Sequence, residues 1–204
     1  MDRTNTREIV HLVASLIVLT IAFTYPSLSP DRMSIVAIAV GTGFLLHELA
    51  HKFTAQRHGY VADYEASPTG LVLALGLSVL TGGGFVFAAP GAVMIRGKKV
   101  YSSFESPYWD SAQTAKEFAY ISMSGAIVNL ILAFSFLAGT FFVTHSGLTY
   151  EILATGARIN AFLAAFNMIP FGPLDGAKVW RYNRMLWAMV EIPAIVLFIA
   201  FGTL

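Results

Sequence analysis

Long apolar stretches alternate with short polar segments along the whole chain. Six of these stretches lie at roughly residues 9–25, 33–53, 71–95, 118–143, 152–169 and 185–204. A helix that crosses the hydrocarbon core of a membrane needs about 20 mostly apolar residues, and most of the stretches are close to that length. The pattern therefore predicts an all-α, polytopic membrane protein with about five to six transmembrane helices.

The third stretch, residues 71–95, differs from the others because Thr81-Gly82-Gly83-Gly84 divides it into two halves. Each half is too short to cross a bilayer alone. The segment is therefore either one broken helix or a Gly-rich hairpin that enters the membrane and returns to the same side. The backbone of such a hairpin must be buried in protein or face a water-filled cavity, because lipid cannot satisfy its polar groups.

The basic residues favour the re-entrant hairpin, since Lys and Arg accumulate on the cytoplasmic side of short loops. With a hairpin, only Arg32 and Arg158 of the 13 basic residues fall on the opposite side. The other basic residues then share one side: Arg3, Arg7, Lys52, Arg57, Arg96, Lys98, Lys99, Lys116, Lys178, Arg181 and Arg184. With a full crossing this bias largely disappears. We therefore predict a multi-pass integral membrane protein with five spanning helices, a re-entrant hairpin after the second helix, and a cytoplasmic N-terminus.

Composition narrows the possible partners and cofactors. The chain is 56% hydrophobic and 12% charged, about half the charge of a typical soluble domain. The formal net charge is +1, and the Lys and Arg residues lie in short scattered clusters. We therefore do not expect nucleic acid as a partner, and the expected partner is the lipid bilayer. The chain has no Cys, so a bound metal ion would need His nitrogen and carboxylate oxygen as ligands. Neither a repeat nor a soluble-domain linker interrupts the chain, which predicts a single membrane-embedded domain over residues 1–204.

The second apolar stretch contains His47-Glu48-Leu49-Ala50-His51. Two His residues four positions apart share one face of a helix, so both imidazoles can reach one ion, and Glu48 can act on a water bound to that ion. The alternative is a pair of interfacial His residues beside a Glu at the membrane end. Ionisable groups inside a membrane are costly and usually functional, which favours the metal site.

A catalytic zinc site generally has three protein ligands and a water molecule. Three carboxylates lie inside or beside apolar stretches and could supply the third ligand: Glu48, Asp175 and Glu191. Asp175 ends a segment in which Pro and Gly residues break the fifth helix and expose backbone groups, although it could equally cap the helix that follows. With the hairpin topology, the end of the second helix and this break face the same side, so Asp175 can meet the His pair.

These motifs resemble those of the site-2 protease family of intramembrane zinc metalloproteases. The resemblance rests on His47-Glu48-Leu49-Ala50-His51, on Phe166-Asn167-Met168-Ile169-Pro170 and on Pro173-Leu174-Asp175-Gly176, and it covers roughly residues 33–180. It implies one zinc ion per chain held by His47, His51 and Asp175, Glu48 as the general acid/base, and a transmembrane protein as the substrate. The zinc side would face the cytoplasm.

The resemblance also suggests residues that position the substrate, namely Asn167, Asn129, Gly82, Gly83 and Gly84. One departure is that many members have a small-Gly-Pro motif where this chain has Ser124-Gly125-Ala126.

Two other functions use the same residues. A divalent-metal transporter or channel also places His and Asp in the membrane, but the sequence has no inverted repeat or second ligand set. A catalytically silent homologue that binds membrane proteins would have no need of Glu48.

Overall fold

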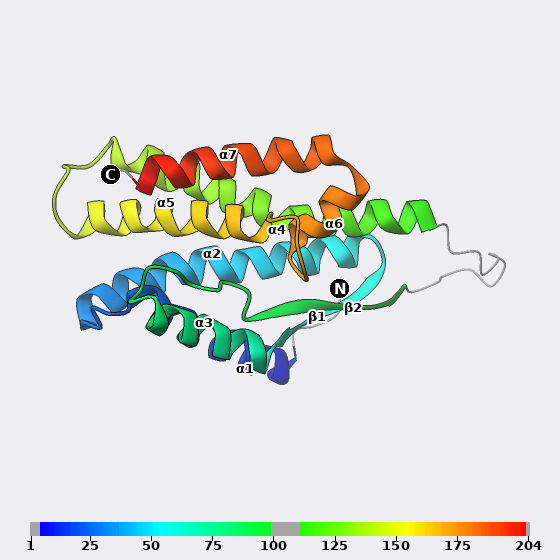
Figure 1. The fold of residues 1–204 in the computed structure, drawn as a ribbon, viewed down its shortest axis with the longest axis horizontal. Coiled ribbons are helices and arrows are strands. Elements are labelled where there is room, and N and C mark those ends of the chain that lie inside the picture. Colours follow the sequence, from blue (N-terminus) through cyan, green and yellow to red (C-terminus); the bar gives the residue numbers. More distant parts are fainter. Residues whose placement is uncertain (1–4, 99–110, 203–204) are drawn as a thin grey trace.

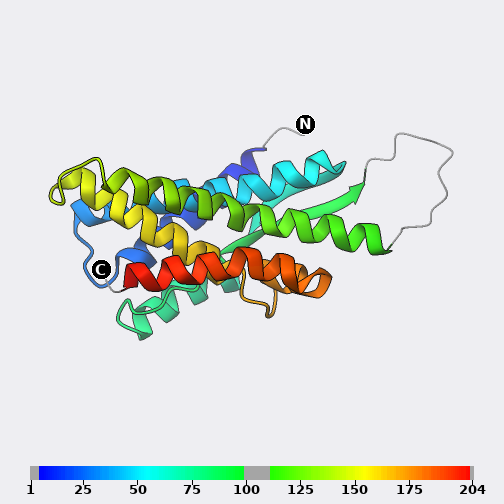
Figure 2. The same ribbon diagram turned by 90° about the horizontal axis from the view of Figure 1, so that it is seen from above.

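A computed structural model describes residues 5–98 and 111–202 of the chain. The elements, in chain order, are α1 (Thr6–Thr24), α2 (Pro30–Arg57), β1 (Tyr60–Ala66), α3 (Pro68–Leu80), β2 (Gly91–Lys98), α4 (Ser111–Thr140), α5 (Leu148–Asn167), α6 (Asp175–Tyr182) and α7 (Arg184–Gly202). The long helices run along the long axis of the molecule, and α4 lies between α2 and α7 in two perpendicular views (Figure 1 and Figure 2).

Four helices in the described part of the chain are long and apolar enough to cross a membrane. They are α1, α2, α4 from Ala112 and α7 to Phe201, and this set is compatible with a multi-pass membrane protein. The predicted fifth span, α5, has 20 residues but is not in this set, because its sequence includes Glu151, Arg158 and Asn160. It contacts α2, α4 and α7; Asn160 is fully buried, whereas Glu151 and Arg158 are exposed.

The expectation of an all-helical chain is wrong at one place. Only the first half of the third apolar stretch is helical, as α3, while the second half is extended and ends in β2, which pairs antiparallel with β1. Burial alternates along the first five residues of β1, which is the period of two typical of a strand. β1 lies between the second and third apolar stretches, in a segment that the sequence analysis treated as a loop. The sheet is therefore absent from the expected fold.

Residues 67–90 form a hairpin that starts and finishes at the same place in the molecule. The backbone nitrogen of Ser67 donates to the carbonyl oxygen of Pro90 over 2.8 Å, and the neighbouring Ala66 pairs with Gly91. Gly82 and Gly83 adopt φ angles of +62° and +85°, which side chains rarely allow, and they reverse the chain after α3. The segment therefore does not pass from one end of the molecule to the other.

The edge of β1 that faces away from β2 is closed by side chains of α1. The backbone nitrogens of Tyr64 and Ala66 donate to Glu8 Oε1 (3.1 Å) and His11 Nδ1 (3.3 Å). Glu8 Oε2 in turn accepts from Lys52 Nζ on α2 over 2.6 Å, and both of these side chains are 2% exposed. The α1 helix thus ties β1 to α2 and fixes the sheet beside the second half of α2.

Candidate metal centre

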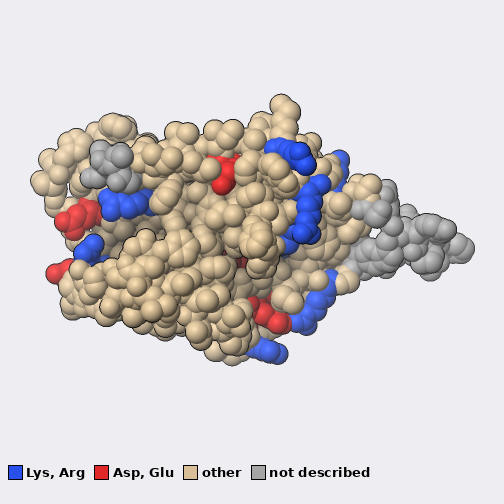
Figure 3. Space-filling model, in the orientation of Figure 1, with Lys and Arg blue, Asp and Glu red and all other residues tan. Residues whose placement is uncertain are grey.

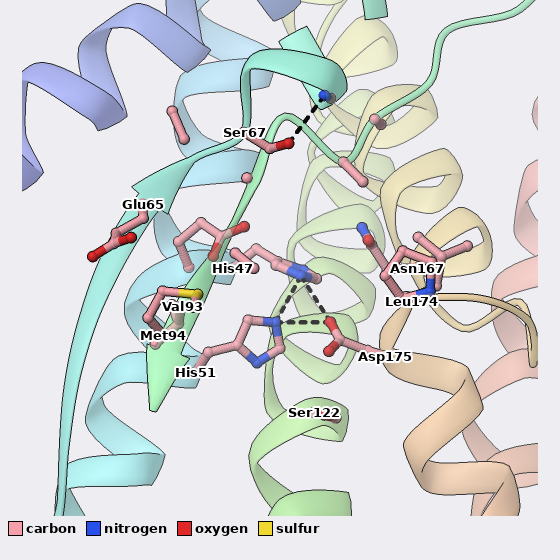
Figure 4. Close-up of a pocket in the computed structure, with 18 of the residues that line it drawn as sticks. His47, His51, Glu65, Ser67, Val93, Met94, Ser122, Asn167, Leu174 and Asp175 are labelled. Carbon is pink, nitrogen blue, oxygen red and sulfur yellow. Dashed lines mark hydrogen bonds and ion pairs between the residues drawn. The ribbon is translucent and has the colours of Figure 1, made fainter. Parts of the chain in front are cut away.

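His47 and His51 lie one helical turn apart on α2, are buried, and direct their Nε2 atoms to one point, where these atoms are 2.9 Å apart (Figure 4). Their Nδ1 atoms contact α4: His47 Nδ1 is 2.6 Å from Asn129 Oδ1, and His51 Nδ1 is 2.7 Å from the carbonyl oxygen of Ile121. Both α4 partners are hydrogen-bond acceptors. Each Nδ1 therefore carries the ring proton, and each Nε2 presents a lone pair.

The orientation of Asn129 is itself fixed by hydrogen bonds. Its Nδ2 donates to the carbonyl oxygen of Gly43 (3.1 Å) and to Asn160 Oδ1 (3.0 Å), so its own oxygen must face His47. Asn129 is fully buried behind the His47 ring and does not line the cavity described below. The structure therefore gives it a contact with a metal-ligand candidate, a common way of orienting such rings; a role of Asn129 toward substrate stays a prediction.

Asp175 begins α6 and completes the cluster. Its Oδ2 lies 2.9 Å from His51 Nε2 and 3.6 Å from His47 Nε2, while its Oδ1 lies 3.3 Å from Lys178 Nζ. The broken segment after α5 brings it there, and Gly176 allows the close approach: a Cβ at this position would lie 1.9 Å from the carbonyl oxygen of Met168. The start of α6 can therefore pack directly against the end of α5.

Two lone pairs and a carboxylate oxygen that face one another are stable only around a cation. His47, His51 and Asp175 form the group that could hold a metal ion among the described residues. Their separations of 2.9, 2.9 and 3.6 Å are close to the roughly 3.3 Å between ligands of a tetrahedral zinc ion bound at about 2.0–2.1 Å. Two His and one carboxylate are also a known catalytic zinc set. The donors therefore fit zinc.

The charge of Asp175 suits this role. The ammonium group of Lys178, whose Nζ lies 3.3 Å from Asp175 Oδ1, favours the ionised form of this carboxyl. Asp175 is therefore ionised at neutral pH and available as a ligand.

A cavity of about 450 Å³ opens beside the three residues. Glu48 lines it from α2, β2 lines it with residues 91–95, and Asn167 and Asp175 lie on the side opposite Val93 and Met94 (Figure 4). Glu48 is 8% exposed, and its Oε2 has no hydrogen-bond partner within the described part of the protein. Buried carboxylate oxygens normally have partners; one without, beside a metal site, can accept a proton from water in the cavity.

Comparison with known proteins bears on this site. The chain is 36% identical over 193 residues to "Putative zinc metalloprotease MJ0611" of Methanocaldococcus jannaschii, and the alignment covers 95% of this chain and 93% of that protein. The chain belongs to the site-2 protease family. Neither a family model nor a solved structure matches it.

The other residues that the site-2 protease resemblance suggested fall in two places. Asn167 lines the cavity, with its Nδ2 donating to the carbonyl oxygen of Leu163 over 2.9 Å. Gly83 and Gly84 instead line a second cavity, and Gly82 lines neither. The structure brings Asn167 to the metal cluster and does not bring the three glycines to it; a role of any of them toward substrate stays a prediction.

Gly125 belongs to the Ser124-Gly125-Ala126 segment, to which the sequence analysis assigned no role in the site. It lies on α4 between Ile121 and Asn129, so these three residues form one stripe at a spacing of four. A Cβ on Gly125 would lie 2.6 Å from His47 Cε1 and from His51 Nε2. The His rings therefore need a bare backbone at this position, and the available signal was a Gly four residues before a buried Asn within an apolar helix.

Proposed function

We propose that this protein is an intramembrane zinc metalloprotease that hydrolyses peptide bonds of membrane-embedded protein substrates, as in regulated intramembrane proteolysis. The observation that carries the proposal is the convergence of His47, His51 and Asp175 beside Glu48, a buried carboxylate with an unpaired oxygen. Family membership supports the same chemistry.

His47, His51 and Asp175 would hold one zinc ion, which when bound supplies a Lewis acid that activates water at neutral pH. Glu48 accepts the proton of the attacking water and returns it to the leaving amine. Asn129 and the Ile121 carbonyl keep the two rings in the tautomer that leaves Nε2 free for the ion.

The proposal places the hairpin in the membrane as a re-entrant segment and makes α5 the fifth crossing. The contact between Ser67 and Pro90 supports re-entry, and α3, with 13 residues, is only about 20 Å long at 1.5 Å per residue. His47 lies about 15 Å from the end of α2 by the same measure, which puts the zinc site within a hydrocarbon core of about 30 Å.

Charge supports an orientation for the molecule. Figure 3 shows Lys and Arg gathered at one end of the visible face, with fewer at the other end. Basic residues favour the cytoplasmic side, so we place that end, the N-terminus and the zinc side in the cytoplasm.

The open edge of β2 gives the substrate a place to bind. The outer edge of β1 is closed by Glu8 and His11, whereas β2 lines the metal cavity. A substrate helix has its amides satisfied internally, so it must unwind locally, and an unwound segment can add to β2 as a strand. A map of photo-crosslinks to residues 85–95 tests this: absence of substrate contacts there contradicts strand addition.

The experiment that tests the function compares two buried glutamates in proteoliposomes. Glu191 on α7 is 4% exposed and also has an unpaired Oε2, but it lies outside the metal cavity. Glu48→Gln should retain zinc and lose cleavage of a transmembrane reporter by about a hundredfold or more, while Glu191→Gln should keep both.

Three outcomes oppose the proposal. Wild-type cleavage by Glu48→Gln refutes the role of this residue. Zinc flux into the vesicles without cleavage identifies a transporter, and reporter binding by the zinc-loaded protein with neither flux nor cleavage identifies a silent binding protein.

A further inference from the structure

A second cavity, of about 700 Å³, lies at the turn of the hairpin, away from the metal cluster. Its walls are largely apolar and aromatic, with Phe23, Phe85, Phe162 and Phe198 contributed by α1, the hairpin, α5 and α7. Its charged wall residues are Arg32 on α2 and Glu151 and Arg158 on α5. A cavity of this kind can accept an apolar chain that carries a charged group.

The two Arg residues of this cavity are unusual in their position. They are the two basic residues that the charge pattern assigns to the side opposite all the others. Both side chains are exposed. Arg158 lies about 15 Å from the start of α5 at 1.5 Å per residue, and a charged residue in the middle of a membrane helix is usually functional. Within residues 5–98 and 111–202, no ion pair to either guanidinium group is present. The cavity therefore offers positive charge for a ligand.

Two elements run from this cavity to the metal cavity. The returning limb of the hairpin lines the second cavity with residues 83–86 and the metal cavity with residues 87–89 and 91–95. Along α5, residues from Tyr150 to Phe162 line the second cavity and Asn167 lines the first. The Phe166 ring of α5 contacts the limb where the two sets of residues meet. Its centroid lies 6.2 Å from that of the Phe85 ring and 5.4 Å from that of the Phe87 ring. An extended peptide that followed the limb would therefore meet residues of both cavities.

We propose that Arg32 and Arg158 bind an acidic side chain of the substrate on the flank that occupies the second cavity. This inference rests on the proposed protease function and defines its substrate class as membrane segments with an Asp or Glu at a set distance from the cleaved bond. Arg32 lies about 22 Å along α2 from His47, and Arg158 about 14 Å along α5 from Asn167. An extended peptide advances about 3.3 Å per residue, which places the acidic residue about four to seven residues from the bond.

A carboxylate suits this pair because guanidinium groups bind it in a bidentate manner. The phosphate of an anionic phospholipid could contact the same groups. The hairpin limb and α5, which contribute residues to both cavities, favour the substrate, since a lipid would have no need of a path to the metal.

The test uses the full-length, zinc-loaded protein in phosphatidylcholine vesicles with a transmembrane reporter. Asp or its neutral isostere Asn is placed in turn four to seven residues from the cleaved bond on each flank. At one of these positions the wild-type kcat/KM should be about tenfold or more higher for Asp than for Asn. Arg158→Gln and Arg32→Gln should bring this ratio toward one, and Arg158→Glu should favour Lys in the reporter. Arg57→Gln, an exposed Arg on α2 outside both cavities, should keep the wild-type ratio.

The outcomes separate this inference from the function on which it rests. Equal cleavage of the Asp and Asn reporters at every position, or an Asp preference that survives in both Arg variants, overturns the inference and leaves the protease intact. Rates that rise with added phosphatidylglycerol equally for both reporters identify a lipid as the occupant and also overturn it. Failure of the zinc-loaded wild type to cleave any reporter overturns the proposed function and the inference together.

Discussion

Replacing Gly125 with Ala should weaken metal binding without unfolding the protein. The new Cβ would lie 2.6 Å from His47 Cε1 and His51 Nε2, against 3.4 Å for ordinary contact, so the rings must retreat by roughly 0.8 Å. Ligand distances in metal sites tolerate deviations of only about 0.2 Å. A shift of α4 gives no relief, because α4 also carries the acceptors that hold both rings. We expect zinc affinity to fall about 10- to 100-fold, as for loss of an outer-sphere contact.

Gly76 on α3 provides the matched control. A Cβ added to Gly76 would have no neighbour within 4 Å, and both glycines lie inside helices. Because Ala has a higher helix propensity than Gly, each substitution should raise the free energy of unfolding by up to about 1 kcal/mol. Only the substitution at position 125 also causes overpacking, which should lower the free energy of unfolding by about 1–3 kcal/mol.

The assay is zinc content after dialysis against a graded series of chelator concentrations, with thermal unfolding of the zinc-free protein measured in parallel. Gly76→Ala should match wild-type zinc affinity and unfold at the same or a higher temperature. If Gly125→Ala binds zinc as tightly as Gly76→Ala does, the contact between α4 and the two rings does not set the ligand geometry, and the reasoning fails.

Three further predictions follow from the same structure. Asp175→Ala should abolish reporter cleavage and lose most of the bound zinc, measured by metal analysis, because a three-donor site loses an anionic ligand; full zinc content would mean a different third ligand. Asn129→Leu should lower zinc affinity about 10- to 100-fold, with cleavage restored at high zinc; loss that zinc cannot restore would instead indicate a direct role toward substrate. Cysteines placed at positions 98 and 181 should be labelled from one side of the membrane and a cysteine at Gly147 from the other; labelling of 98 and 181 from opposite sides would contradict the re-entrant hairpin.

The sequence predicts the metal cluster better than it predicts the fold around it. The residues at positions 47, 51 and 175 come together because two of them share a helix face and the third follows a break that Pro and Gly specify locally. The apolar stretches likewise predict the four long apolar helices α1, α2, α4 and α7, whereas the predicted fifth span, α5, is less apolar. These features are local, so a single sequence contains them.

The sheet and the support of the His rings depend on contacts between distant segments. β1 is a short strand whose partner lies beyond a whole helix, and no local signal links Tyr60 to the strand that begins at Gly91. Asn129 acquires its role through Gly43 and Asn160 on two other helices. A polar residue in an apolar helix needs a hydrogen-bond partner, but the sequence does not show whether that partner is a substrate or the ring of a metal-ligating His.

The ion pair between Glu8 and Lys52 has a consequence for how the protein is made. During synthesis α1 emerges before α2, carrying a carboxylate whose partner lies 44 residues later in the chain. In the proposed orientation this carboxylate lies at the cytoplasmic end of α1, and it stays without its cationic partner until α2 packs beside it. We therefore expect α1 and α2 to pack as a unit first, and the backbone nitrogen of Tyr64 to reach Glu8 only after that unit has formed. Assembly in this order protects the sheet from pairing with other chains before the bundle exists to shield it.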